Sequence, residues 1–144
     1  MPSEEEAVRA ATLKLYDAIE DMATGRGLER MAEAWHHIDD ASTGHPIDNW
    51  TVGWESVWTT WQASAVFGRA DRGGGKVLSM RVFVNGDNAH ALTTFKAAPA
   101  WGGGVMACTN VLRKIDGHWK IVHHHADKSP EMAAALEAML EAGG

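Results

Sequence analysis

Histidine is the residue type in this chain best suited to chemistry near neutral pH. His45 stands before a proline, and His123 and His125 occupy alternate positions in one strand-like segment. An imidazole titrates near neutrality, so each ring can accept or donate a proton at physiological pH. Because a residue before proline favours an extended backbone, we expect His45 at a strand end with its ring directed into a cavity. The pattern predicts acid–base chemistry, and histidines that only make structural hydrogen bonds are the alternative.

Aromatic side chains could form the walls of such a site. The chain holds 7 tryptophans in 144 residues, which is unusually many. Trp54 begins a helical stripe within residues 53–67 and is expected to pack inside, whereas Trp50 and Trp101 fall in predicted loops and could line a pocket mouth. An apolar, aromatic pocket suits a flat, hydrophobic ligand. The expected partner is therefore a small hydrophobic molecule.

A metal site is an alternative use of the same histidines. Zinc accepts three imidazoles, and His45, His123 and His125 would supply them, with Asp39 as a further ligand. Nothing in the sequence shows that His45 reaches the other two rings, so we expect no metal. Asp39 could instead orient a histidine, as a carboxylate does in many acid–base pairs. The glycine runs lack the spacing of a phosphate loop or a dinucleotide fingerprint, so we expect no cofactor.

Hydrophobic periodicity divides the chain into elements that would position these residues. Apolar residues recur at helical spacing after Ser3, from Leu28 to Trp35 and within 53–67, and an extended segment over 38–46 lies between the last two. Alternating patterns then predict strands, which we expect near 78–84, 89–98, 105–115 and 118–126. A last helix opens at Pro130 and would turn Met132, Leu136, Met139 and Leu140 inward. This order predicts an α+β fold with one curved sheet and helices on one of its faces.

The second hairpin allows the faces of its strands to be assigned. Asp116-Gly117 fits a two-residue turn. A regular ladder from that turn would pair Asn110 with His123, and Cys108 with His125. Cross-strand partners share a face, so Asn110, His123 and His125 are expected to look into the cavity. His124 would then lie on the opposite face, toward solvent or a partner subunit.

Two segments resemble a known family. Residues 38–46 read I-D-D-A-S-T-G-H-P and are followed by Gly53-Trp54. This resembles the segment A-D-D-A-x-x-x-D-P of ketosteroid-isomerase-like enzymes in the NTF2-like (SnoaL-like) superfamily, with His45 where the isomerase has its aspartate base. Residues 110–113 resemble the isomerase segment D-V-M-R, whose aspartate donates a hydrogen bond to the substrate oxyanion. Asn110 would be a neutral amide donor there, and Tyr16 lies near the position of the family's second donor, a tyrosine.

The resemblance implies an architecture and a reaction class. The expected fold is a single SnoaL-like domain over 1–144, an NTF2-like cone in which a curved antiparallel sheet carries three N-terminal helices on its concave face and a C-terminal helix. The implied protein is a homodimer joined through the outer sheet face. The implied activity is that of a cofactor-independent isomerase or lyase (a dehydratase or cyclase), with His45 as base, Asn110 polarising a carbonyl, and His123 or His125 returning the proton. A non-catalytic ligand-binding or dimerisation module of the same fold is the alternative.

Composition excludes several other classes. A formal net charge of -6 argues against a nucleic-acid surface, which needs a basic stripe. No run approaches the roughly eighteen apolar residues of a membrane helix. The acidic N-terminus lacks the apolar stretch of a signal peptide. One cysteine, Cys108, is consistent with a reducing compartment, so we expect a cytoplasmic protein.

Overall fold

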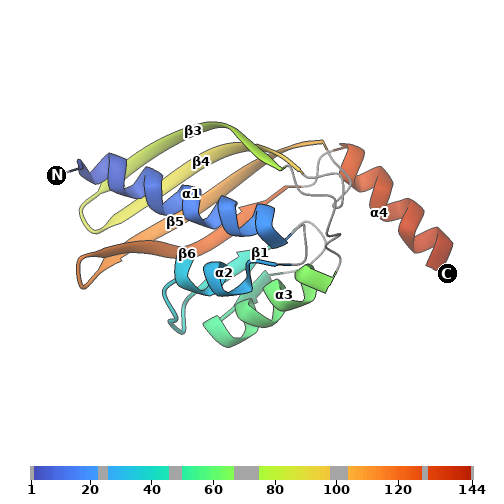
Figure 1. The fold of residues 1–144 in the computed structure, drawn as a ribbon, viewed down its shortest axis with the longest axis horizontal. Helices are drawn as coiled ribbons and strands as arrows, with labels where there is room; N and C mark the ends of the chain where they lie inside the picture. The colour runs from blue at the N-terminus through green and yellow to red at the C-terminus, as the bar shows by residue number, and fades with distance from the viewer. Residues whose placement is uncertain are drawn as a thin grey trace.

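The computed structural model describes residues 2–22, 26–45, 50–66, 75–97, 104–127 and 130–143 (Figure 1). Helices and strands follow the predicted α+β order. They are α1 (Glu4–Met22), α2 (Leu28–Ala34), β1 (Ser42–Gly44), β2 (Trp50–Val52), α3 (Trp54–Val66), β3 (Lys76–Asn85), β4 (Asn88–Lys96), β5 (Val105–Ile115), β6 (His118–Ala126) and α4 (Pro130–Gly143). None of the described helices is long and apolar enough to cross a membrane.

The strands form one curved sheet in the order β2-β1-β6-β5-β4-β3. The predicted meander accounts for β3 to β6, which pair antiparallel through two tight turns. The sheet is mixed rather than wholly antiparallel, because β1 joins β6 in parallel. That pairing sets Ser42 beside His123, and Gly44 beside His125. The segment that carries His45 is therefore attached directly to the histidine-rich end of β6.

Helix α1 crosses the sheet and covers the core (Figure 1). The Ser3 hydroxyl accepts a hydrogen bond from the Glu6 amide at 3.1 Å, which caps the start of the helix. One face of α1 is buried over its whole length, and Tyr16 lies on that face between Thr12 and Ile19. From the sheet, alternate residues of β4 and β5 complete the core: Ala89, Ala91, Thr93, Phe95, Met106, Cys108, Asn110 and Leu112.

A bulge in the β5–β6 hairpin changes the predicted register. Asp116 and Gly117 form the expected turn with positive φ angles, and Leu112 pairs with Ile121 as predicted. The ladder then slips by one residue, so that Asn110 pairs with His124 rather than with His123. Because successive side chains of a strand alternate between faces, one extra residue reverses every face assignment beyond it. The predicted placement of His123 and His125 beside Asn110 was therefore wrong.

The last helix also differs from its prediction. Helix α4 runs away from the sheet (Figure 1). Met139 is 57% exposed and Leu140 is 76% exposed, so the expectation that both turn inward was wrong. Helical spacing predicts an amphipathic helix, but it does not determine whether another element covers the apolar face.

Candidate acid–base site

Polar side chains from separate elements meet in the interior of this domain. Tyr16 comes from α1, Thr93 from β4, Asn110 from β5 and His124 from β6, and His45 directly follows β1. All of them are buried, and Asn110 is 0% exposed. A buried polar group is costly unless it finds a hydrogen-bond partner. The side chains of this cluster must therefore be oriented so that their polar atoms meet partners.

A chain of hydrogen bonds joins four of these side chains. The Tyr16 hydroxyl is hydrogen-bonded to the Thr93 hydroxyl, and Asn110 Nδ2 donates to Tyr16 Oη at 3.0 Å. The same Nδ2 donates to the Ala91 carbonyl at 3.3 Å, which fixes the amide orientation because a carbonyl can only accept. Asn110 Oδ1 therefore faces His124 Nδ1 at 2.6 Å and accepts its hydrogen. In a neutral His124 ring, Nε2 is then the unprotonated nitrogen.

Burial decides the charge states within this chain. Burial lowers the pKa of His124 well below its ordinary value, and positive charge on His45, His123 or His125 would lower it further. His124 is therefore a neutral ring at pH 7. Burial also raises the pKa of Tyr16 far above its ordinary value, so that its hydroxyl stays protonated. The four hydrogen-bonded side chains therefore carry no net charge at neutral pH.

The protonation of His45 can be assigned from its neighbours. His45 Nε2 lies 3.0 Å from Thr60 Oγ1 and 3.5 Å from Thr43 Oγ1. The Thr60 hydroxyl donates its hydrogen to the Val57 carbonyl, and the Thr43 hydroxyl donates to the His124 carbonyl. Each hydroxyl oxygen can therefore only accept from His45, so Nε2 carries a hydrogen. In the neutral ring, Nδ1 is the basic nitrogen.

The two imidazoles and one indole form a compact group of rings. The ring centroids of His45 and His124 are 6.4 Å apart. Trp61 of α3 meets His45 edge-on at 4.4 Å, with an interplanar angle of 86°, and lies 5.7 Å from His124. The two imidazoles, which have opposite tautomers in their neutral forms, thus share one aromatic environment.

The structure brings some of the predicted residues together and separates others. His45 lies beside His124, His124 is hydrogen-bonded to Asn110, and Asn110 contacts Tyr16, which the sequence places near the family's tyrosine position. His123 and His125 lie on the opposite face, because of the bulge. His123 Nδ1 is 2.7 Å from Ser42 Oγ, and the Trp50 ring lies 5.0 Å from the His125 ring.

The remaining predicted residues lie apart from this group. Trp50 is 62% exposed on that outer face, and Asp39 is exposed in the turn before β1. Trp54 is half-buried and stacks on His37, with ring centroids 4.1 Å apart. Trp101 lies outside the described residues. Sequence reasoning missed His124, and the bulge that turns it inward has no mark in the local sequence.

Asn110 has a different task from the one predicted. Both hydrogens of its amide nitrogen already have acceptors, in Tyr16 Oη and the Ala91 carbonyl. It therefore has no hydrogen left for a substrate carbonyl. Its oxygen instead holds His124 in one tautomer, which makes Asn110 an orienting residue.

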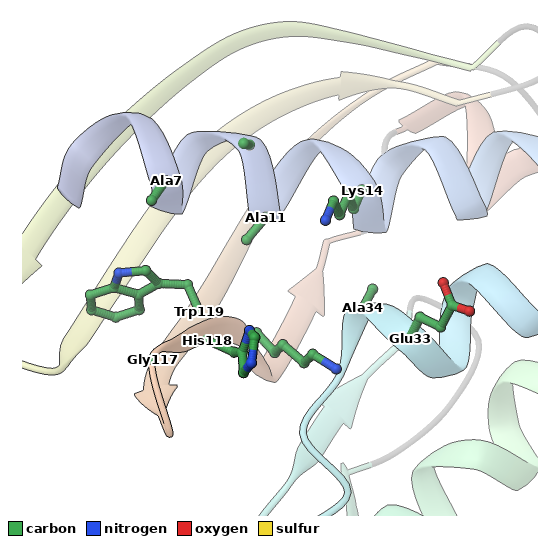
Figure 2. Close-up of a pocket in the computed structure, with 10 residues that line it drawn as sticks. Ala7, Ala11, Lys14, Glu33, Ala34, Gly117, His118 and Trp119 are labelled. Atoms are coloured by element: carbon green, nitrogen blue, oxygen red, sulfur yellow. The ribbon is translucent and has the colours of Figure 1, made fainter. Parts of the chain in front are cut away.

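Neither a metal centre nor the described pocket coincides with this cluster. Within the described residues no group of three or more histidine, cysteine, aspartate or glutamate side chains could hold a metal ion. A groove of about 300 Å³ lies between α1, α2 and the β5–β6 turn (Figure 2). Its lining includes Ala7, Ala11, Lys14, Ala34, His118 and Lys120, and it includes none of the predicted site residues.

Comparison with known proteins identifies the family. Residues 12–128 match the model of the SnoaL-like domain. The chain belongs to the SnoaL-like family. No curated protein matches the sequence.

Solved structures agree on the SnoaL-like fold, at identities that show the fold alone. A proposed dehydratase of the NTF2-like family from Streptomyces avermitilis has a TM-score of 0.70 and 22% identity, over 86% of this chain and 94% of that one. A proposed calcium/calmodulin-dependent protein kinase II association domain from Thiobacillus denitrificans has a TM-score of 0.69 and 22% identity, over 83% and 92%. A proposed ketosteroid isomerase from Parabacteroides distasonis has a TM-score of 0.65 and 17% identity, over 89% of both chains.

Proposed function

We propose that this SnoaL-like protein is a cofactor-independent isomerase, dehydratase or cyclase. It would move a proton beside the carbonyl of a small hydrophobic substrate bound at the histidine cluster. The observation that carries the proposal is the buried pair of imidazoles, His45 and His124, with ring centroids 6.4 Å apart and complementary tautomers. Family membership and the neighbours described as a dehydratase and an isomerase support the reaction class.

In the proposed reaction His45 is the base. Its Nδ1 removes the proton from the carbon beside the carbonyl, while its Nε2–H remains hydrogen-bonded to Thr60 Oγ1. The resulting imidazolium returns the proton to another carbon in an isomerisation, or to a leaving hydroxyl in a dehydration. His124 replaces His123 and His125 as the imidazole beside the base, but His45 itself returns the proton, because the hydrogen on His124 Nδ1 is donated to Asn110. Because His124 is neutral, His45 can become a cation without a like charge beside it.

Hydrogen exchange of a simple ketone tests His45 without knowledge of the natural substrate. The measurement is NMR of the hydrogens beside the carbonyl of 1-indanone in D₂O, with and without protein. His45→Gln keeps a side-chain donor for Thr60 but removes the base, so we expect catalysed exchange to fall by at least about 100-fold. His118→Gln is the matched control, because His118 is exposed at the hairpin turn. Equal exchange rates in the His45→Gln variant and the unmodified protein would eliminate His45 as the base.

A second candidate function is assembly or ligand binding without catalysis. The outer face of the sheet exposes apolar side chains, with Phe83, Leu92 and Val105 each 40 to 48% exposed. One structural neighbour is described as an association domain. We propose a homodimer through this face and place the protein in the cytoplasm. Leu92→Glu should then convert a dimer into a monomer in light scattering, and a monomer before substitution would refute the homodimer.

A further inference from the structure

Trp61 carries a hydrogen-bond donor that nothing in the described structure satisfies. Trp61 Nε1 and Trp35 Nε1 are the buried side-chain polar atoms without a partner among the described residues. An unmet buried N–H costs on the order of 1–3 kcal/mol, and native proteins keep few of them. Such a group therefore calls for an explanation, and a bound ligand is one.

The position of Trp61 connects its free donor to the candidate base. Trp61 is 3% exposed, and its ring meets the His45 ring edge-on at 4.4 Å. Its neighbour in the chain, Thr60, is the residue that accepts from His45 Nε2. One turn of α3 thus supplies both the hydroxyl that accepts from His45 and an indole ring in contact with His45.

The proposed reaction needs a donor of this kind. Removal of a proton beside a carbonyl builds negative charge on the carbonyl oxygen, which a preorganised N–H or O–H group must stabilise. The amide hydrogens of Asn110 are both in use, and the Tyr16 hydroxyl is hydrogen-bonded to Thr93 and Asn110. The family's expected donors are therefore occupied, whereas the Trp61 donor is not.

We propose that Trp61 Nε1–H donates a hydrogen bond to the oxygen of the bound ligand, and so takes the role that the sequence gave to Asn110. This inference rests on the proposed function and adds the ligand class. An indole N–H can donate but not accept, so it selects an acceptor oxygen. Because Trp61 and His124 are both neutral, a buried carboxylate would find no counter-charge from them. Trp61 and His124 therefore favour uncharged ketones or related carbonyl compounds with a flat, apolar body.

Trp35 provides a matched control within the same chain. Its N–H is also buried and unmet, but its described ring contacts are with Trp54 and Trp61 rather than with either buried histidine. Replacing either residue with phenylalanine removes one unmet donor and keeps an aromatic ring. Effects common to both variants report on packing, and effects confined to Trp61→Phe report on the site.

The test uses 1-indanone and indane, which share a shape but differ in the carbonyl. In protein labelled with ¹⁵N-tryptophan, 1-indanone should move the Trp61 indole N–H resonance downfield and leave that of Trp35 in place. By equilibrium dialysis the unmodified protein should prefer 1-indanone over indane, after correction for their partition into water. The Trp61→Phe variant should lose about fivefold of this preference, as expected for one neutral hydrogen bond, and Trp35→Phe should keep it. If Trp61→Phe does not fold, the resonance shift in the unmodified protein decides alone.

Opposite results would overturn the inference. They are the absence of 1-indanone binding at millimolar concentration, a Trp61 resonance that indane moves equally, or a Trp61→Phe variant that keeps the full preference. The failure of the proposed function is distinguishable from these. Hydrogen exchange that survives His45→Gln, together with a carbonyl-dependent Trp61 shift, would refute the base and leave the Trp61 contact standing.

Discussion

Mild acid should destabilise the protein through His124. Burial lowers the pKa of this ring in the folded state, whereas in the unfolded chain it titrates near 6.5. Below that pH the unfolded chain binds a proton that the folded protein does not. The free energy of unfolding must therefore be highest above about pH 6.5 and fall as the pH drops from there toward the folded-state pKa. The titratable groups around the ring are His45, Tyr16, His123 and His125, and the three histidines oppose its protonation.

The size of this effect follows from the linkage of protonation to folding. The slope approaches about 1.4 kcal/mol per pH unit for one proton taken up only on unfolding. Between pH 6.5 and 5.5 the integrated loss is about 1 kcal/mol, provided the folded-state pKa lies below that window. This is a measurable part of a typical total of about 5–15 kcal/mol. The pKa of His123 is also lowered, first by burial and then by His125, so it adds a smaller contribution of the same sign.

Urea unfolding at pH 7.5, 6.5 and 5.5 measures this slope. His124→Asn removes the titrating ring and keeps a side-chain donor near Asn110. The slope of its unfolding free energy against pH should therefore correspond to about one fewer proton taken up on unfolding. His118→Asn should keep the original slope, because His118 is exposed at the hairpin turn. Glu4 and Asp40 do not interfere, since hydrogen bonds from Lys114 and Arg113 lower the pKa of these two carboxyls and they act only below about pH 4.5. Identical slopes for His124→Asn and the unmodified protein would show that His124 is not a buried neutral ring.

Two further substitutions test the packing around the site by urea unfolding. Tyr16→Phe should lower the free energy of unfolding by about 1–3 kcal/mol, because it leaves an Asn110 hydrogen buried without its acceptor. An unchanged midpoint would contradict the hydrogen-bond chain. Gly44→Ala should destabilise, because a Cβ atom at this position would lie 2.7 Å from the Trp50 ring. In a Trp50→Ala background the penalty should become smaller, and a tight contact of 3.1 Å between the new Cβ and His125 Cδ2 would remain. An undiminished penalty in that background would rule out the contact with Trp50.

Local patterns in the sequence predict most of the architecture. Helical spacing places α1 and α3, and the dipeptide Asp116-Gly117 places the turn between β5 and β6. The hairpin register is correct from Ile115 to Leu112, where the turn geometry controls it. These features depend on residues within one turn or one ladder, so a single sequence contains them.

The site depends on relations that such patterns do not contain. The bulge lies several residue pairs from the turn. Because of the one-residue slip there, His124 faces inward beside Asn110, and His123 and His125 face outward. The contact between Tyr16 and Asn110 joins residues 94 positions apart. The parallel pairing of β1 with β6 joins segments about 80 residues apart, and it carries His45 to His124. Which strand lies beside which is decided by packing of the whole domain.

The contrast between Trp35 and Trp61 shows how far an unmet hydrogen-bond donor can be used as evidence. Each indole N–H is buried without a partner among the described residues, so the absence of a partner does not by itself identify a site. The two differ in their surroundings, because only Trp61 has described ring contacts with both His45 and His124. Around Trp61 the neighbouring polar groups are satisfied in a way that fixes two tautomers, which is the preorganisation that proton transfer requires. An unsatisfied donor at the centre of a satisfied network is the arrangement expected where the missing acceptor belongs to a ligand.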